Sequence, residues 1–271
     1  MKQSLVSVIV PTKNSAQFLD KCLESVKNQT YPNVELIVVD NNSSDSTKEI
    51  AKKYTSLVFN KGPERCAQVN YGATKAKGKY IYRVDSDFIL EKEVISQAVD
   101  QCENKGFDAI AVHNTSDSTI SFWAKVRQLE RDCYEHDTLN IAARFFSKEL
   151  FNKVSGFNEN LLAAEDYDLH NRVLAEGAKI GFVTAKEVHI GEPTSLWEIA
   201  QKHYYYGKTI GQFLKQNPQR GTKQLSPIRG SYLKNWKKFL LNPVMFIGFL
   251  IYQIVRYTSA AAGFIAQKVV K

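Results

Sequence analysis

Short apolar runs rich in β-branched residues alternate along the first 115 residues with segments whose apolar positions recur every three to four residues. The runs predict strands, and the longer periodic segments predict helices. Strand and helix in turn, joined by short loops, is typical of βαβ units in a largely parallel sheet with right-handed crossovers. The expected strands are 5–10, 34–39, 57–59, 80–84 and 107–112, and the expected helices are 16–28, 46–54, 66–77 and 92–103.

The alternation changes beyond residue 115. Two prolines and two glycines in the loose stretch 216–231 predict a linker between a body and a C-terminal helical tail, 232–271. No internal repeat or low-complexity tract is present. The elements expected before the linker are a long polar helix over 118–138, a strand over 139–147, a helix over 164–176, strand and turn over 179–190, and a helix over 195–215.

The positive charge is concentrated near the end of the chain. The 271 residues carry a formal net charge of +8, and a composition 44 % hydrophobic and 24 % charged is typical of a folded globular protein. Residues 199–271 contain twelve Lys and Arg and no Asp or Glu. The remaining 24 Lys and Arg, against all 28 Asp and Glu, therefore give residues 1–198 a net charge of −4. A slightly acidic body precedes a strongly basic tail.

The basic tail also contains a long apolar stretch, residues 239–266, which polar residues and a proline interrupt. A spanning helix needs about 20 mainly apolar residues, so we expect a monotopic amphipathic helix or hairpin in the membrane interface, its lysines facing anionic head groups. The alternative is an ordinary core helix. A nucleic-acid surface is not expected, because the apolar run follows the lysines directly. Aromatic residues suited to an interfacial belt are Tyr232, Trp236, Tyr252 and Tyr257.

The cysteines and the N-terminus point to a reducing compartment. Cys22, Cys66, Cys102 and Cys133 lie far apart in segments expected to be helical and form no CxxC pair, so free thiols are expected rather than disulfides or zinc ligands. The first apolar run spans only residues 5–10 before a proline, too short for a signal-peptide core. It is expected to be the first strand.

Polar residues follow three of the expected strands, where open parallel sheets bind their ligands. They are Pro11–Asn14, Asp40–Asp45 and Asp85–Asp87. The chain contains no G-x-G-x-x-G, and Gly72 and Gly78 are separated by five residues where a phosphate loop needs four. Neither a dinucleotide-dependent dehydrogenase nor a P-loop NTPase is supported.

Asp85 and Asp87 stand one residue apart at the end of an apolar strand. Two ionised carboxylates this close repel each other, which raises the pKa of one unless a positive charge lies between them. Mg²⁺ or Mn²⁺, held by one or two carboxylates together with substrate phosphates, would satisfy both. The alternative is a solvated turn.

The chain contains, in this order, the five blocks VSVIVPTKN, VELIVVDNNSSDST, GPERCAQVNYGATKAKGKYI, RVDSD and AAEDYDLHNRVLAEG. Together these blocks resemble the inverting family 2 glycosyltransferases of GT-A fold. The resemblance covers about residues 4–210, and the five blocks occur in the family's order. It implies a Rossmann-like, mostly parallel sheet flanked by helices over 1–215, with a nucleotide-binding half (1–115) and an acceptor-binding half (116–215).

The resemblance also implies a role for each matching residue. Pro11, Thr12 and Lys13 would line the nucleoside pocket, Asp40 would accept hydrogen bonds from the base, and Arg65 would stack on or pair with the nucleotide. Asp85 would lie near the ribose and the metal. Asp87 would bind the metal directly, with His189 near it. Asp166 would be the general base, with Glu165 on the acceptor side.

Several of these residues also have a structural interpretation. Helix capping would explain Asp45 or Ser46, and Glu165 and Asp166 could be dipole partners at the start of a helix. His189 could be a satisfied structural histidine. The histidines at 113, 136, 170 and 203 fit no pattern.

The function implied is metal-dependent, inverting transfer of one sugar from a nucleotide sugar, UDP- or GDP-linked, to a lipid-linked or glycan acceptor at the cytoplasmic membrane face. One carboxylate suffices as base in such a single displacement. Residues 196–211 lack the Q-x-x-R-W motif of members that extrude polysaccharide, so processive synthesis is not expected. A sugar-phosphate nucleotidyltransferase and a non-catalytic membrane adaptor are the alternatives. The identity of the sugar, the base and the oligomeric state stay open.

Overall fold

The computed structural model describes residues 3–269 and divides into two compact units. The first unit comprises the residues up to His113 together with Ala142–Glu159 and Leu169–Gly191. The second comprises Asn114–Ile141, Asn160–Asp168 and the residues from Glu192 onward. The chain passes between the units several times, so neither unit is one continuous segment.

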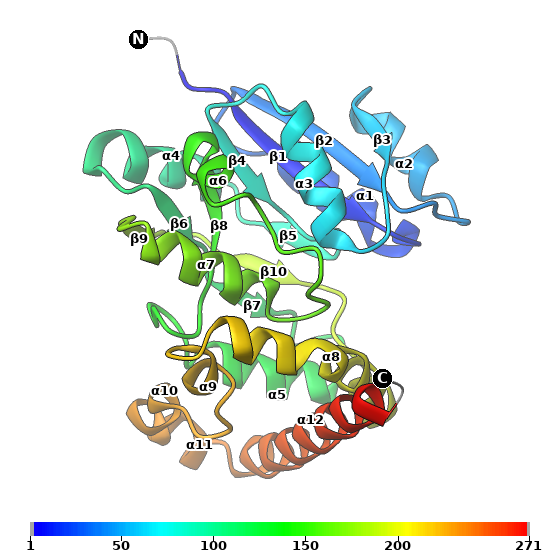
Figure 1. The fold of residues 1–271 in the computed structure, drawn as a ribbon, viewed down its shortest axis with the longest axis vertical. Helices are drawn as coiled ribbons and strands as arrows, with labels where there is room; N and C mark the ends of the chain where they lie inside the picture. Colours follow the sequence, from blue (N-terminus) through cyan, green and yellow to red (C-terminus); the bar gives the residue numbers. More distant parts are fainter. Residues whose placement is uncertain (1–2, 270–271) are drawn as a thin grey trace. The chain divides into compact units, whose positions relative to one another are not determined.

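A seven-stranded sheet in the order β3-β2-β1-β4-β8-β6-β9 forms the centre of the first unit (Figure 1). The pairs β1–β2, β1–β4, β2–β3 and β6–β9 are parallel, whereas β8 is antiparallel to both β4 and β6. The expected α/β fold with a mostly parallel sheet is confirmed, with β8 as the antiparallel exception. The strands are β1 (Val6–Thr12), β2 (Val34–Asp40), β3 (Val58–Asn60), β4 (Tyr80–Arg83), β6 (Ala109–Ala111), β8 (Ala143–Ser147) and β9 (Ile180–Phe182).

Helices cover both faces of this sheet, which explains why its strands are continuous apolar runs rather than alternating ones. Val8 and Val10 of β1 pack in one apolar cluster with residues of α1 and α4, while Ile9 packs in another with residues of α3, α6 and α7. The helices are α1 (Ala16–Lys27), α2 (Thr47–Tyr54), α3 (Arg65–Lys75), α4 (Val94–Lys105), α6 (Lys148–Lys153) and α7 (Glu165–Ala175), which begins in the second unit.

A second, short strand pair follows the apolar strand β4. β5 (Phe88–Leu90) pairs antiparallel with β10 (Glu187–His189), and the register places Phe88 opposite His189. The run after Asp87 therefore becomes a strand of its own, which the sequence did not predict. This pairing joins segments about one hundred residues apart in the chain.

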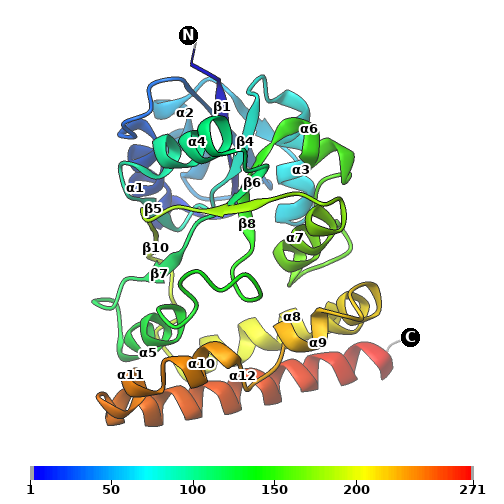
Figure 2. The same cartoon turned by 90° about the vertical axis from the view of Figure 1, so that its left-hand side faces the viewer.

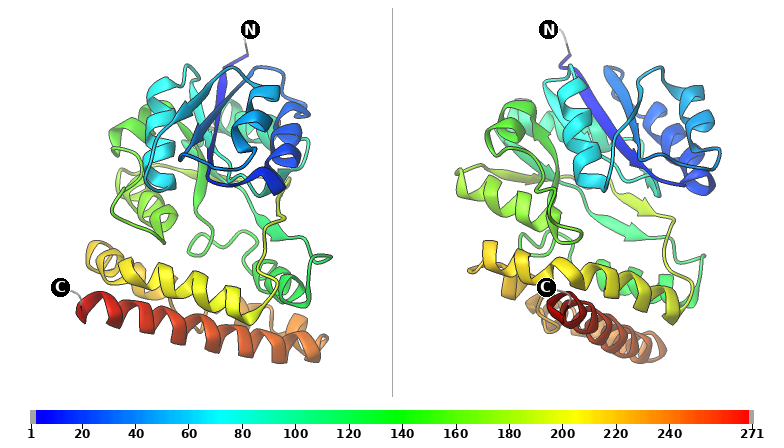
Figure 3. Two further views of the ribbon diagram at one scale, coloured as in Figure 1. Left: turned by 90° about the vertical axis from the view of Figure 1, so that its right-hand side faces the viewer. Right: turned by 45° about the vertical axis from the view of Figure 1, so that its right-hand side comes forward.

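The second unit is mainly helical, and α8 and α12 lie side by side in it (Figures 2 and 3). Their backbones approach closely. A Cβ at Gly207 would lie 2.1 Å from the carbonyl oxygen of Ala260, and one at Gly263 would lie 2.0 Å from that of Tyr204. The elements are β7 (Asn114–Ser116), α5 (Phe122–Arg131), α8 (Leu196–Gln216), α9 (Gly221–Gln224), α10 (Gly230–Lys234), α11 (Trp236–Leu240) and α12 (Pro243–Val269).

Helix α12 has one packed face and one exposed apolar face. Gly248, Phe249 and Tyr252 are buried, and Gly248 approaches α5 so closely that a Cβ there would meet Phe122 at 2.8 Å. By length and mean hydropathy (1.4) α12 could also cross a membrane, a test that core helices of soluble proteins pass as well. The exposed apolar side chains of α11, α12 and their junction include Leu240, Leu241, Val244, Ile247, Leu250, Ile251 and Ile254.

Two expectations for the middle and end of the chain are wrong in detail. The helix expected over 118–138 is only α5, because the chain turns after Asp132 and His136 adopts a positive φ of 61°. The stretch expected to be a linker, 216–231, contains α9 and the start of α10. Residues 270–271, the end of the expected helical tail, lie outside the described residues.

Candidate active site

The polar segments after β1, β2 and β4 lie at one edge of the sheet, because these three strands are parallel neighbours. Pro11 and Thr12 end β1 and are buried, and Lys13 follows them exposed, donating its backbone N–H to Ser15 Oγ at 3.3 Å. Asp40 ends β2 opposite Thr12. The strand register therefore places Thr12 and Asp40 side by side at the carboxyl end of the sheet.

The Asp40 carboxylate is fully buried and held by several donors. The Thr12 hydroxyl donates to Oδ1 at 3.0 Å, and Ser43 donates through its hydroxyl to Oδ1 and through its backbone N–H to Oδ2 at 2.8 Å. The Lys48 ammonium lies 3.5 Å from Oδ2. A carboxylate offers about four lone-pair positions, so Asp40 already has a full set of partners and fixes the loop after β2.

Asp45 has the structural role that capping predicts. Its Oδ1 accepts from the Thr47 backbone N–H at 3.1 Å, and its Oδ2 accepts from the Ala16 backbone N–H at 3.1 Å. The side chain therefore ties together the first turns of α1 and α2. Hydrogen bonding from the Thr47 side chain lowers the pKa of Asp45.

Asp85 is the centre of a buried charge network. Arg83 donates to Oδ1 from Nη2 at 2.9 Å, and Arg144 pairs with Oδ2. The other end of the Arg144 guanidinium pairs with Glu187, and Glu187 also accepts from the Tyr82 hydroxyl at 2.5 Å. The order along the network is Arg83, Asp85, Arg144, Glu187, and all four lie in the first unit.

This network keeps Asp85 ionised. Burial alone would raise the pKa of its carboxyl, but the charges of Arg83, Arg144 and, third, Arg65 outweigh burial and hold the pKa well below its usual range. Arg65 is the first residue of α3, and its charge also lowers the pKa of Asp85. Both oxygens of Asp85 already accept hydrogen bonds from guanidinium groups. Asp85 is therefore suited to orienting the side chains of Arg83 and Arg144.

Asp87 and His189 face each other across the β5–β10 pair. His189 Nε2 lies 2.9 Å from Asp87 Oδ2, and the Ile190 backbone N–H donates to the Asp87 carbonyl at 2.8 Å. The His189 ring is buried and packs at 4.7 Å between centroids on Phe88, whereas the Asp87 side chain is 31 % exposed. The structure thus joins two residues that the sequence places 102 positions apart.

Backbone at Gly191 also approaches Asp87. A Cβ at this glycine would lie 2.6 Å from Asp87 Oδ2 and 2.8 Å from its Cβ. Any larger residue at position 191 would displace the Asp87 side chain, so the structure requires a glycine there. The sequence analysis did not identify Gly191. A glycine two residues after a candidate ligand was the available signal.

Asp87 and His189 fit a metal that is completed by its substrate. Carboxylate oxygen and imidazole nitrogen are ligands for Mn²⁺, and the carboxylate also suits Mg²⁺. Among residues 3–269, no group of three or more His, Cys, Asp or Glu is placed to hold a metal by itself.

Glu165 and Asp166 are the first residues of α7 and lie in the second unit. Asp166 Oδ1 accepts from the Tyr167 backbone N–H at 2.8 Å, and the Tyr167 hydroxyl donates to the Asn140 carbonyl at 3.1 Å. Glu165 is buried, with 1 % of its surface exposed. A helix N-terminus favours the ionised form of a carboxylate, which is the form a general base needs.

Sequence reasoning missed Arg144 and Glu187. Both carry charge inside strands, β8 and β10, where neighbouring residues are buried. A charged residue inside an apolar strand needs a partner, and that was the available signal. The partners themselves lie 43 and 59 residues away from Arg144, so spacing could not identify them.

Carboxylates and guanidinium groups thus lie beyond the carboxyl ends of parallel strands, where open α/β sheets bind their ligands. The chain matches the family model described as Glycosyl transferase family 2 over residues 7–157, more than half its length. The protein belongs to glycosyl transferase family 2, as its sequence motifs indicated.

Curated relatives carry glycosyltransferase names. The chain is 33 % identical over 128 residues to glycosyltransferase GlyG of Streptococcus pneumoniae, covering 44 % of this chain and 42 % of the relative. It is 24 % identical over 236 residues to chondroitin synthase of Escherichia coli, covering 78 % and 33 %. The chain thus spans less than half the length of these two relatives.

Solved structures share the fold. The mannosyltransferase PcManGT of Pyrobaculum calidifontis, in complex with GDP-Man and Mn²⁺, has a TM-score of 0.61 at 17 % identity, covering 100 % of this chain and 76 % of that one. TarS of S. aureus has a TM-score of 0.56 at 18 % identity, covering 97 % and 54 %. These similarities confirm the expected GT-A-type fold.

Proposed function

We propose that this protein transfers a single sugar from a nucleotide sugar to an acceptor hydroxyl, with inversion at the anomeric carbon and with a divalent metal. The observation that carries this proposal is the Asp87–His189 pair beside the ionised Asp85 network, at the edge of a family 2 sheet. Relatives of this fold bind UDP, UDP-GlcNAc or GDP-Man, the last with Mn²⁺.

The residues of the first unit would bind the donor. Pro11, Thr12 and Lys13 would line the nucleoside pocket, with Asp40 shaping its loop through Ser43. Arg65 would meet the diphosphate, where a guanidinium can pair bidentately. Asp85, held by two guanidinium groups, would orient this edge and lie near the ribose.

Asp87 and His189 would hold Mn²⁺ or Mg²⁺ together with the donor phosphates. The bound ion would supply charge neutralisation for the diphosphate as it leaves. Asp166 would accept the proton of the acceptor hydroxyl, and Glu165 would lie on the acceptor side. A general base of this kind contributes about 10²–10⁴ in rate.

The acceptor is proposed to be lipid-linked or a glycan at the cytoplasmic face of a membrane. Two features of the tail support this proposal. Helices α11 and α12 have an exposed apolar face. The basic residues Lys234, Lys237 and Lys238 lie beside that face, in a segment without acidic residues. Helix α12 is long and apolar enough, with a mean hydropathy of 1.4, to associate with a membrane. Each basic side chain near an anionic surface adds about 1 kcal/mol.

Thermal stabilisation by nucleotides tests the donor assignment. We would measure the melting temperature with UDP, GDP, CDP and ADP and their sugars, with and without Mn²⁺, for the wild type and Asp87→Ala. A shift for one nucleotide that needs metal and is lost in Asp87→Ala is expected, since bound ligand stabilises the folded state. Asp100→Ala, which removes an exposed carboxylate of α4, is the matched control.

Two results would contradict the proposal. If no nucleotide stabilises the folded protein, the chain is better explained as a membrane adaptor. If it binds a nucleoside triphosphate and a sugar phosphate and releases pyrophosphate, it is a nucleotidyltransferase.

A further inference from the structure

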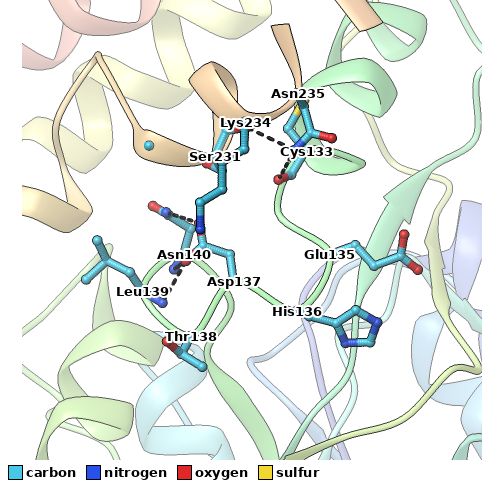
Figure 4. A pocket seen from close by; sticks show the side chains of 11 residues that line it. Cys133, Glu135, His136, Asp137, Thr138, Leu139, Asn140, Ser231, Lys234 and Asn235 are labelled. Carbon is cyan, nitrogen blue, oxygen red and sulfur yellow. Dashed lines mark hydrogen bonds between the residues drawn. The ribbon is translucent and has the colours of Figure 1, made fainter. Parts of the chain in front are cut away.

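The second unit contains a pocket of about 300 Å³ between the loop 133–140 and α10 (Figure 4). Asn235 joins its two walls, since its Nδ2 donates to the Cys133 carbonyl at 3.3 Å and to the Ser231 carbonyl at 2.9 Å. Protein atoms cover Asn140 Oδ1 and Ser231 Oγ, so a molecule in the pocket cannot reach them. No ligand is therefore inferred for this pocket.

In the first unit, the buried guanidinium of Arg144 contacts three other side chains at once. Its Nη1 pairs with Glu187 Oε2 at 2.5 Å, and its Nη2 pairs with Asp85. Its Cζ lies 4.9 Å from the centroid of the Phe88 ring, within the range of a cation–π interaction. Because a guanidinium is planar and rigid, this one side chain fixes the relative positions of its three neighbours.

Two of these neighbours lie on either side of Asp87 in the sequence. Asp85 precedes Asp87 by two residues, and Phe88 follows it directly. The Phe88 ring packs on the His189 ring at 4.7 Å between centroids, and the strand register places the two residues opposite each other. Arg144 thus holds both the segment that carries Asp87 and the ring that packs on His189.

The third neighbour, Glu187, lies on the same strand as His189. Side chains two residues apart in a strand point to the same face, so Arg144 contacts β10 on the face that carries His189. Glu187 is fully buried, and its Oε1 accepts from the Tyr82 hydroxyl at 2.5 Å. One oxygen of Glu187 is therefore held by Tyr82 while the other holds Arg144.

Fold stability alone does not account for this network. The charges of Arg83, Asp85, Arg144 and Glu187 cancel, but a buried ion pair is often no more stabilising than apolar side chains of similar volume. Apolar side chains would also suit β8, where Phe145 is buried next to Arg144. The contacts around Asp87 and His189 give the network a second role.

We propose that Arg144 is a positioning residue, which Glu187 orients and which keeps Asp87 and His189 placed to bind a divalent metal together. The inference rests on the proposed function, because the metal and the nucleotide belong to that function. Arg144 acts through Asp85, Phe88 and Glu187. Changes to groups that orient metal ligands cost about 10–100-fold in metal affinity.

Tyr82→Phe tests this role with a small change. It removes the hydroxyl that donates to Glu187 and keeps every charge of the network. The Mn²⁺ concentration needed for half-maximal stabilisation by the nucleotide is expected to rise about two- to tenfold, which corresponds to the loss of one hydrogen bond. At saturating Mn²⁺ the shift in melting temperature should equal that of the wild type. This readout needs no acceptor.

Tyr80→Phe is the matched control. Tyr80 lies on the same strand as Tyr82, and both rings pack on Phe145. Its hydroxyl donates to a different carboxylate, Glu103 Oε1, at 2.8 Å. This variant also loses a hydrogen bond from tyrosine to glutamate, but its Mn²⁺ requirement should stay that of the wild type.

Arg144→Lys is the larger change. The ammonium keeps the buried charge but replaces the rigid fork with a point charge, which cannot hold Asp85 and Glu187 in the same geometry. The Mn²⁺ requirement should rise about 10–100-fold. If this variant does not fold, Tyr82→Phe and its control decide the question.

The other outcomes separate this inference from the proposed function. An unchanged Mn²⁺ requirement in Tyr82→Phe, or an equal rise in Tyr80→Phe, would refute the positioning role and leave the transferase proposal intact. The network would then serve the stability of the fold. If no nucleotide stabilises the wild type with metal, the proposed function fails, and the positioning role fails with it.

Discussion

At the scale of single residues, the ionic partners of Asp85 and Asp87 distinguish the roles that the two carboxylates can take. Asp85 and Asp87 look equivalent in sequence, yet Asp85 is bound by Arg83 and Arg144 while Asp87 faces His189. The identity of the candidate residues followed from the sequence. The sequence analysis also assigned Asp85 to the ribose side and Asp87, with His189, to the metal, but it did not include Arg144, which comes from a strand 59 residues further along the chain.

Asp166→Asn tests the proposed base. The amide keeps the size of the side chain but cannot accept the proton, so kcat should fall about 10²–10⁴-fold, measured as nucleoside diphosphate release with the donor that stabilises the protein. Nucleotide-induced stabilisation should be unchanged. Activity close to that of the wild type would assign the base to another residue.

Gly191→Ala tests whether the position of Asp87 matters. The added Cβ would lie 2.6 Å from Asp87 Oδ2 and force this carboxylate away from His189. Changes to groups that orient a metal ligand cost about 10–100-fold in metal affinity. The Mn²⁺ concentration needed for half-maximal stabilisation by nucleotide should rise by that factor.

Stabilisation without metal is the internal control for Gly191→Ala, because the nucleoside pocket is untouched. An unchanged Mn²⁺ requirement would show that Asp87 is not the metal ligand.

At the scale of elements, one buried carboxylate joins three helices of the second unit. Glu130 of α5 accepts from Arg256 of α12 at 2.9 Å and from Tyr232 of α10 at 2.8 Å, and it also pairs with Arg127. Burial alone would raise the pKa of Glu130, but Arg127, Arg256 and Arg229 hold it well below its usual range. The sequence showed these residues only as scattered charges.

Glu130→Ala should therefore be strongly destabilising. It leaves buried guanidinium groups without their counter-charge, which typically costs about 3–5 kcal/mol, measurable by urea unfolding. Because the pKa is depressed on folding, this contribution is complete above about pH 4.3, the unfolded value, and declines as the pH falls below it. Glu149→Ala, at an exposed position of α6, is the control and should change stability by less than about 0.5 kcal/mol.

Element boundaries show where local pattern was insufficient. The seven-stranded order and the antiparallel β8 depend on pairing between distant segments, which periodicity does not encode. The short strand β5 was hidden because Asp85 and Asp87 suggested a loop. By contrast, β1, β2 and α7 were predicted within about two residues, since long apolar runs and clear helical spacing determine them locally.

At the scale of the molecule, α11 and α12 expose more large apolar side chains than the surface of a globular protein usually does. Leu240, Val244, Ile247, Ile251 and Ile254 follow each other at helical spacing and are 40–63 % exposed. Contiguous exposed apolar patches mark interaction surfaces. The adjacent lysines favour an anionic lipid surface as the partner.

A paired Ile247→Glu and Ile254→Glu variant tests that surface. Burying an isoleucine side chain is worth about 1.5–3 kcal/mol, so sedimentation with vesicles of phosphatidylcholine and phosphatidylglycerol should weaken at least about tenfold. Gln201→Glu with Thr222→Glu adds the same charge at exposed positions of α8 and α9 and should bind as the wild type does. Undiminished vesicle binding, or a concentration-dependent dimer that the variant abolishes, would assign the face to something other than lipid.

The sequence by itself determined the α/β class, the family, the basic tail and most candidate site residues. It could do so because apolar periodicity and short motifs act over a few neighbouring residues. Only the tertiary structure decided that Arg144 binds Asp85, that Gly191 lies against Asp87, and that Glu130 joins three helices. Each of these depends on contacts between segments tens of residues apart or more, and chain spacing carries no record of such contacts.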